Sequence, residues 1–217
     1  MASELKNLFR KLEWSDFTAN ASIPEPKPGV AASVAKTKVD YTYTGVNINR
    51  VAGTKPVIYR LADTVTITIR LKPFSDSWKA KWLSKLPQSQ QDSLIGHERG
   101  HYRLSALLYR DLFVELMYLK GKDYTSTADA SKDFTAIQDR YSMAVVQEVH
   151  NTYDGTSETN HKPYLNASTQ AAQTKWEGYF DKAVSDKAPL FHVLADAGYS
   201  FTTTRPASPV VVPIPFK

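Results

Sequence analysis

Residues 94–108 read Leu94-Ile-Gly-His97-Glu98-Arg99-Gly100-His101-Tyr-Arg-Leu-Ser-Ala-Leu-Leu108, and this stretch decides which fold is expected. Apolar residues recur in it with helical spacing, and the pattern continues to about Leu119, after which Lys120-Gly121 supplies a stop signal. The apolar stripe is wide, and it includes Leu94, Leu104, Leu107, Leu108, Leu112, Phe113 and Leu116. We therefore predict a long central helix, beginning after the polar residues 89–93, that packs on more than one face.

Within this helix stands His97-Glu98-Arg99-Gly100-His101, which has the pattern H-E-x-x-H. The four-residue spacing places both imidazoles on one helix face, so two nitrogens can reach one tetrahedral zinc ion. Glu98 lies about 100° around the helix from His97, where its carboxylate can take a proton from a zinc-activated water without being a ligand. With five His and eight Glu in 217 residues, about 0.004 such pentapeptides are expected by chance. The motif therefore predicts a zinc site with Glu98 as general base.

The alternative for these residues is a surface helix whose histidines are merely solvated. Leucines share the face of the histidines, which indicates that this face points inward. Two buried imidazoles need partners, and one metal ion satisfies both. Gly100 costs up to about 1 kcal/mol in a helix interior, so its presence indicates that another group packs closely against it.

A catalytic zinc ion needs a third protein ligand and an open position. The chain has no cysteine, so only His, Asp and Glu remain as ligands. The metzincin pattern requires glycine and histidine where this chain has Leu104 and Leu107, which excludes that class. His150, in a helical segment beside Glu148, keeps open a third ligand from a second helix. His192, between apolar residues, is expected to be an ordinary packed or capping histidine.

The stretch from Leu94 to Leu108 resembles the core motif of a bacterial family of predicted secreted zinc-dependent proteases. Further motifs of that family occur in the same order: Leu12-Glu-Trp14-Ser-Asp16-Phe17, Ser77-Trp78, Tyr153-Asp154, Thr159-Asn-His161 and Gln173-Thr-Lys-Trp176.

The resemblance implies a zinc peptidase whose third ligand is His161, ahead of Glu148, His150 and Asp154. It also implies that Tyr153 or Tyr164 lies near the metal and donates a hydrogen bond to an oxyanion, which would give Tyr153 a catalytic role. A secreted or periplasmic location follows from the same resemblance. The chain itself has no apolar run near its start that would be typical of a signal peptide.

The N-terminal half has strand patterns. Residues 39–44 alternate Val, Tyr and Tyr with Asp and Thr, and residues 64–71 alternate β-branched residues with Thr and Arg, after a shorter strand pattern at 57–59. Residues 5–20 are expected to form a short helix or turn, and residues 75–86 a short helix that Pro87 ends. Two more helices are predicted at about 130–152 and 168–183.

We therefore expect an α+β fold in which a small antiparallel sheet packs on a zincin-like helical part containing the long H-E-x-x-H helix. Residues 1–201 are expected to form a single domain, with a β-rich part at about 1–74 and a helical part at about 75–201. Residues 202–217 contain four prolines after Arg205 and are expected to form an extended tail.

The composition limits the possible partners. The formal net charge is +5, but lysines and arginines are spread along the chain with no run longer than two, so nucleic-acid binding is not favoured. No stretch approaches the roughly 18–20 apolar residues of a membrane span. The expected partner is a peptide or protein substrate, and the sequence gives no oligomeric state.

Three functions remain open. The first is a zinc endopeptidase, and the second is a zinc amidase acting on another amide, such as a peptidoglycan cross-link. The third is a binding or scaffold module whose zinc site is structural or vestigial. An open coordination position beside Glu98 would favour the enzymes, whereas four protein ligands would favour the scaffold.

Overall fold

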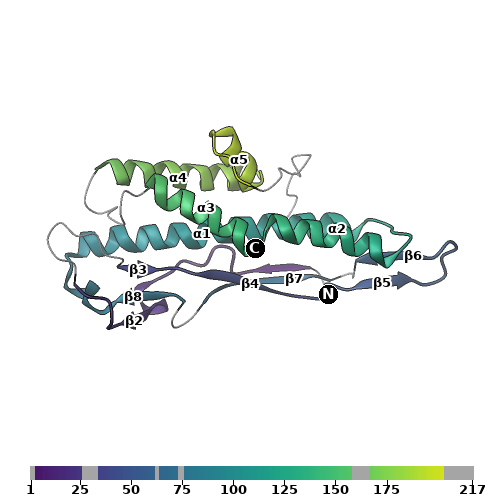
Figure 1. Cartoon of the computed structure of the whole chain (residues 1–217), viewed down its shortest axis with the longest axis horizontal. Helices are drawn as coiled ribbons and strands as arrows, with labels where there is room; N and C mark the ends of the chain where they lie inside the picture. The colour runs from purple at the N-terminus through teal and green to yellow at the C-terminus, as the bar shows by residue number, and fades with distance from the viewer. Residues whose placement is uncertain (1–2, 26–33, 62–63, 73–75, 158–166, 203–217) are drawn as a thin grey trace.

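The structure is a computed structural model that describes residues 3–25, 34–61, 64–72, 76–157 and 167–202 (Figure 1). His161, Tyr164 and nearly all of the expected tail, from position 203 onward, lie outside the described residues. In the described part the chain is α+β, with the strands in the first 80 residues and the long helices after them.

The strands form two three-stranded sheets and one hairpin. The first sheet has the order β1 (Glu4–Lys6), β7 (Thr66–Leu71), β4 (Val39–Thr44). The second has the order β2 (Thr18–Asn20), β8 (Trp78–Ala80), β3 (Ala35–Lys36). The hairpin pairs β5 (Ile48–Val51) with β6 (Ile58–Leu61). Because β1 and β2 run parallel to β7 and β8, both sheets are mixed, which corrects the expectation of an antiparallel sheet.

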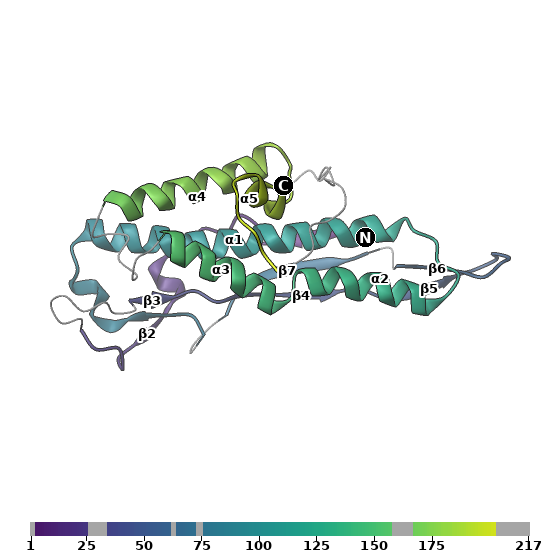
Figure 2. The same ribbon diagram turned by 45° about the horizontal axis from the view of Figure 1, so that its top comes forward.

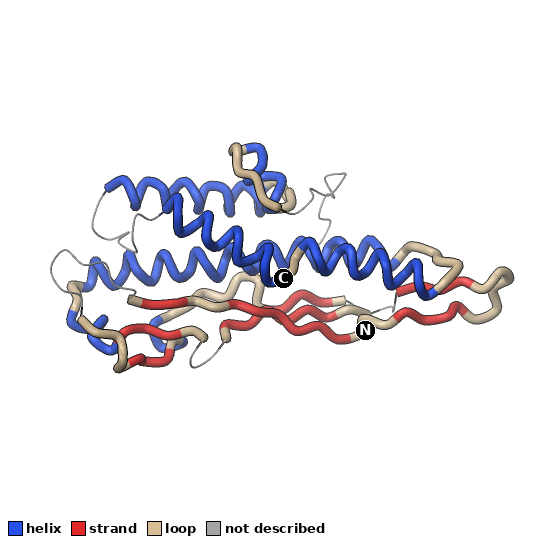
Figure 3. Tube along the Cα trace, in the orientation of Figure 1, coloured by secondary structure: helices blue, strands red, loops and turns tan. Residues whose placement is uncertain are grey.

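The helices lie along one side of these strands. They are α1 (Gln88–Lys120), α2 (Thr127–Arg140), α3 (Met143–Ser157), α4 (Ala167–Ser185) and α5 (Leu190–Asp196). Helix α1 runs between the strands and α4, with α3 beside it, as Figures 1 and 2 show from two directions. Colouring by secondary structure shows the same division into a strand layer and helical layers (Figure 3).

The predicted central helix is confirmed, and it is covered on several sides. Leu104, Leu108 and Leu112 are fully buried, as is Tyr109 beside them. This follows from the wide apolar stripe, because a helix between a sheet and other helices needs apolar residues on both sides. The helix begins at Gln88, earlier than predicted, because the polar residues 89–93 continue it in solvent.

The period-two strand patterns are also confirmed. Val65, Ile67 and Ile69 have no exposed surface, and β7 pairs with β4 over six residues from Val39↔Leu71 to Thr44↔Thr66. On β4, the ring of Tyr41 lies 4.5 Å from that of Tyr109 on α1. The sheet is thereby fixed to the helix that carries the H-E-x-x-H motif.

Two predictions of local structure were only partly right. Residues 5–20 contain strands β1 and β2, with a single helical turn at Trp14–Asp16. Residues 78–80 form a strand that pairs with β2 and β3. Just before it, the Ser77 hydroxyl accepts from the N–H and donates to the C=O of Lys38. A short 3-10 helix follows at Lys81–Lys85.

The helix predicted at 130–152 is two helices with a break at residues 141–142. Tyr141 leaves the helical conformation, and its buried hydroxyl donates to Glu115 of α1 at 2.6 Å. The Ser142 carbonyl then accepts from the N–H of Val146, and this bond closes the first turn of α3. This break sets the direction of α3, and so it decides which side chains of α3 reach α1.

One apolar core joins the described strands and helices, since buried residues from Leu8 to Leu194 form a single cluster. A smaller cluster of Val34, Ala80, Trp82, Leu83 and Leu94 lies between the second sheet and the start of α1. Among the described residues, no helix is both long and apolar enough to cross a bilayer.

Candidate metal centre

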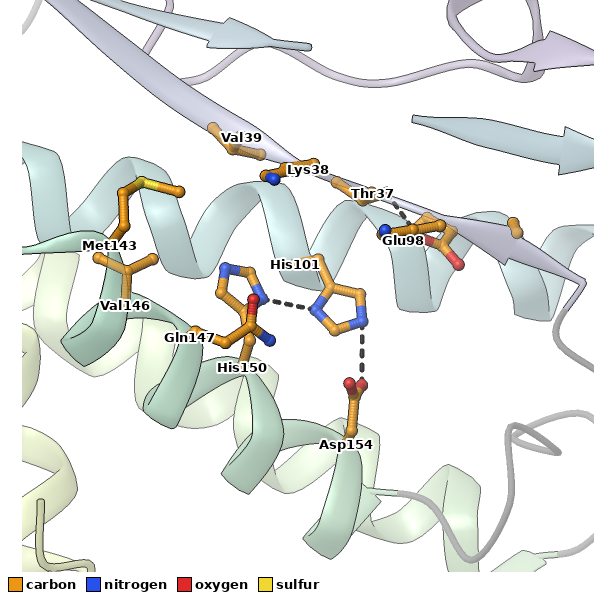
Figure 4. Close-up of a pocket in the computed structure, with 12 residues that line it drawn as sticks. Thr37, Lys38, Val39, Glu98, His101, Met143, Val146, Gln147, His150 and Asp154 are labelled. Carbon is orange, nitrogen blue, oxygen red and sulfur yellow. Dashed lines mark hydrogen bonds and ion pairs between the residues drawn. The ribbon is translucent and has the colours of Figure 1, made fainter. Parts of the chain in front are cut away.

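Three metal-binding side chains from two helices meet at one point. His97 and His101 come from α1, and Asp154 comes from α3. Oδ1 of Asp154 lies 3.3 Å from Nε2 of His97 and 3.0 Å from Nε2 of His101. Figure 4 shows Asp154 below His101, with the two side chains directed toward each other.

These distances suit a shared metal ion. Two ligands about 2.05 Å from a tetrahedral zinc ion lie about 3.3 Å apart. Both ring nitrogens of His97 and Oδ1 of Asp154 are buried and make no regular hydrogen bond in the described part of the chain, although Oδ1 lies at ion-pair distance from both Nε2 atoms. Buried polar atoms are rarely left unsatisfied, and His97 is only 3% exposed. A cation bound between the three groups would satisfy them together, so the residues fit a zinc ion.

The electrostatics of the three groups also suit a cation. Burial lowers the pKa of His97, which favours the neutral imidazole whose lone pair a metal needs. Burial alone would raise the pKa of Asp154, but the two imidazoles outweigh it and hold the pKa below its ordinary value. At neutral pH the site therefore offers an ionised carboxylate and a neutral His97.

Glu98 lies beside these groups and faces a pocket. The Thr37 hydroxyl, on the segment that joins β3 to β4, donates to Oε2 of Glu98 at 2.5 Å. The pocket has a volume of about 280 Å³, and its lining includes Glu98, His101 and Asp154. Residues 35–39 form one wall, and residues 143–154 of α3 form the opposite wall (Figure 4). The carboxylate is therefore placed as a general base would be, next to the candidate ligands and open to the pocket.

A fourth side chain of this cluster, His150, lies behind His101. The Nδ1 atoms of the two rings are 2.8 Å apart, and Nε2 of His150 is 2.7 Å from Oγ of Ser105. Burial lowers the pKa of His150 to about 3. His150, one of the alternatives for the third ligand, thus contacts a candidate ligand.

Tyr153 lies on the other side of the histidines, away from the pocket. Its ring stacks on that of His97 with centroids 4.9 Å apart, and its hydroxyl donates to the His97 carbonyl. The side chain is fully buried and does not line the pocket. An oxyanion donor must point its hydroxyl into the pocket. The structure places Tyr153 in a packing position, and its expected catalytic role stays a prediction.

Gly100 is the reason that Tyr153 can lie there. A Cβ atom at position 100 would be 2.1 Å from the Tyr153 hydroxyl oxygen and 2.7 Å from Cζ. The expectation that some group packs closely against Gly100 is therefore confirmed.

The remaining predicted residues have different outcomes. His161, the expected third ligand, lies outside the described residues, and among the described residues Asp154 takes the third place. Glu148 accepts from the backbone N–H and the hydroxyl of Thr202, so its carboxylate is directed away from the metal centre. His192 is packed in α5, as expected.

Sequence analysis missed Thr37 and Ser105. Thr37 stands in no motif, and Ser105 lies in the 94–108 stretch without a role assigned to it there. Each acquires its role only because a distant element lies against it. Comparisons of the chain with models of protein families, with curated proteins and with solved structures found no match.

Proposed function

We propose that the protein is a zinc-dependent peptidase in which His97, His101 and Asp154 hold the metal and Glu98 is the general base. The observation that carries the proposal is the convergence of ligand atoms from His97, His101 and Asp154 beside a glutamate that faces a pocket. A zinc ion held there would supply Lewis acidity toward a carbonyl oxygen and would lower the pKa of a coordinated water.

Glu98 has the central role in the proton transfers. Its carboxylate takes the proton of the attacking water and then delivers it to the leaving amine. The Thr37 hydroxyl occupies Oε2 of Glu98, which leaves Oε1 as the oxygen that can accept the proton. Thr37 is thus a positioning residue, because it holds the carboxylate in one orientation toward the pocket.

The walls of the pocket favour a peptide as the substrate. Strands β3 and β4 lie at the edges of their sheets among the described strands, and residues 35–39, which include their junction, line the pocket. An extended peptide can add to a sheet edge through main-chain hydrogen bonds. A peptide that lay along residues 35–39 would pass between this edge and α3, over Glu98 and His101.

The motifs that carry the resemblance to secreted zinc proteases support the same proposal. Three of these motifs, although distant in sequence, contact the H-E-x-x-H segment or each other: Arg99 donates to the Leu12 carbonyl at 2.7 Å, and Tyr153 packs on His97. Trp176 packs against Tyr153 with ring centroids 5.3 Å apart. We propose on these grounds that α1 and the sheet beside it have the zincin-like arrangement expected from the sequence.

Other functions use related sites. Two histidines and one carboxylate also hold iron in non-haem oxygenases, but those sites need no adjacent general base. An amidase acting on peptidoglycan cross-links would use the same groups as a peptidase, and a scaffold would not need Glu98 to face the pocket. Elemental analysis distinguishes zinc from iron, and cross-linked muropeptides tested beside peptides distinguish the two hydrolases.

The substitution Glu98→Gln tests the proposal, because glutamine keeps the shape of the side chain but cannot take up the proton. We expect zinc content and fold to be unchanged while cleavage of a peptide library falls about 10²- to 10⁴-fold, equivalent to about 3–5 kcal/mol. Glu148→Gln, at a carboxylate directed away from the site, is the matched control and should keep full activity. If Glu98→Gln cleaves as fast as the parent while both hold zinc, Glu98 is not the base.

A further inference from the structure

His150 is a buried histidine whose hydrogen bonds, within the described part of the chain, go to His101 and Ser105. It is 8% exposed, and Ser105 has no exposed surface. Its Nδ1 lies 2.8 Å from Nδ1 of His101, and its Nε2 lies 2.7 Å from Oγ of Ser105. Figure 4 shows His101 between His150 and Asp154, with one contact on each side of its ring.

The positions of the protons on these rings follow from the contacts when zinc is bound. The Nε2 atom of His101 faces the candidate metal position beside Asp154, and a zinc ion there needs its lone pair, so the proton of the neutral ring is then on Nδ1. This proton can be donated only if Nδ1 of His150 is an acceptor. The proton of a neutral His150 is then on Nε2, where it is donated to the Ser105 hydroxyl oxygen.

We propose that His150 and Ser105 form a relay that fixes the tautomer and ring orientation of His101, and that this relay raises the zinc affinity of the site. The inference rests on the proposed zinc site. Metal-ligating histidines commonly donate their second N–H to a carboxylate or a carbonyl, and such partners orient the ring and increase its basicity. Here a second histidine takes that place, and a serine fixes the tautomer of that histidine.

The same contacts exclude His150 as a metal ligand in this arrangement. Both of its ring nitrogens already have partners, Nδ1 with His101 and Nε2 with Ser105. Asp154, one helical turn further along α3, instead places its carboxylate at the Nε2 atoms of His97 and His101. One face of α3 therefore supplies both a ligand and the residue that positions another ligand.

Zinc affinity, measured by competition with a chromogenic chelator, tests the relay in full-length variants. His150→Phe keeps a ring of similar size but offers no acceptor to His101, so we expect zinc to bind about 10- to 100-fold more weakly. His150→Asn keeps an acceptor near Nδ1 and should recover part of the affinity. His192→Phe, the same change at a buried histidine of α5, should bind zinc as the parent does.

A second readout follows the proton itself. In ¹⁵N spectra of the zinc-bound parent, we expect the Nδ1 proton of His101 to exchange slowly with solvent, and we expect this protection to be lost in His150→Phe. If His150→Phe does not fold, as judged by circular dichroism, Ser105→Ala replaces it, with an expected loss of a few-fold in affinity. If the substituted protein binds zinc as tightly as the parent, the relay is refuted. If the parent itself binds no zinc, the proposed function fails instead.

Discussion

The substitution Gly100→Ala should damage both the stability of the protein and its metal centre. In an ordinary helix interior this change stabilises, because alanine has a helix propensity about 1 kcal/mol better than glycine. Here the added Cβ would lie 2.1 Å from the hydroxyl oxygen and 2.7 Å from Cζ of Tyr153. Both distances are far below van der Waals contact, so the tyrosine ring has to move.

The ring has little room for such a movement. Tyr153 is fully buried, and it lies between the ring of His97, at 4.9 Å, and that of Trp176, at 5.3 Å. Overpacking of a core costs about 1–3 kcal/mol, occasionally more. After the gain in helix propensity, we expect a net loss of up to about 2 kcal/mol in the free energy of unfolding. Since the ring stacks on His97, its movement should also weaken zinc binding.

Urea unfolding and chelator competition measure the two effects. Ala106→Gly on the same buried helix is a control that removes a methyl group without touching Tyr153. In the double variant Gly100→Ala/Tyr153→Leu the clash is absent. Tyr153→Leu should therefore lower the free energy of unfolding less in the Gly100→Ala background than in the parent. If Gly100→Ala stabilises the protein and leaves zinc affinity unchanged, the proposed packing of Tyr153 against the helix is refuted.

Three further predictions concern the base, a buried carboxylate and the metal. Thr37→Val removes the hydroxyl that holds Glu98, so kcat for a cleaved peptide should be about 10-fold lower at unchanged zinc content, and Thr37→Ser should restore it. An unchanged kcat in Thr37→Val would be evidence against this role of Thr37. Burial raises the pKa of Asp111 to about 6, against an ordinary 3.8, so the folded protein binds the carboxyl proton more tightly than the unfolded chain does. As pH rises from about 4 to 6, the free energy of unfolding should therefore fall by up to about 3 kcal/mol relative to that of Asp111→Asn. Urea unfolding of both proteins measures this, and a difference in unfolding free energy that does not change with pH would contradict it. Removal of zinc with a chelator should lower Tm by roughly 8–16 °C if the free metal stood about 1,000-fold above Kd, because only the folded state binds it; an unchanged melting curve would argue against a site that is coupled to folding.

The sequence was sufficient to predict the parts of the fold that depend on local periodicity. Strand β7 and helix α1 follow from apolar spacing, and the two histidines of α1 share a face because they are four residues apart. The close approach at Gly100 was also predictable, since glycine in a buried helix needs a packing reason.

The third ligand was not predictable in the same way, because it depends on the direction of α3 relative to α1. That direction follows from the break at Tyr141, whose hydroxyl pairs with Glu115 across the helix interface. Asp154 stood among the alternatives, behind His161, only where the family resemblance was applied. Thr37 and Ser105 carried no local signal, since a single hydroxyl gains a function only from what a distant element brings to it.

The position of Asp154 in the metal centre is tested most directly by the zinc content of purified variants. Elemental analysis should find close to one equivalent of zinc in the parent protein and in His161→Ala, and almost none in Asp154→Ala, with all three proteins folded by circular dichroism. Full zinc in Asp154→Ala together with its loss in His161→Ala would contradict the assignment, because the third ligand would then be the histidine and not the aspartate of α3.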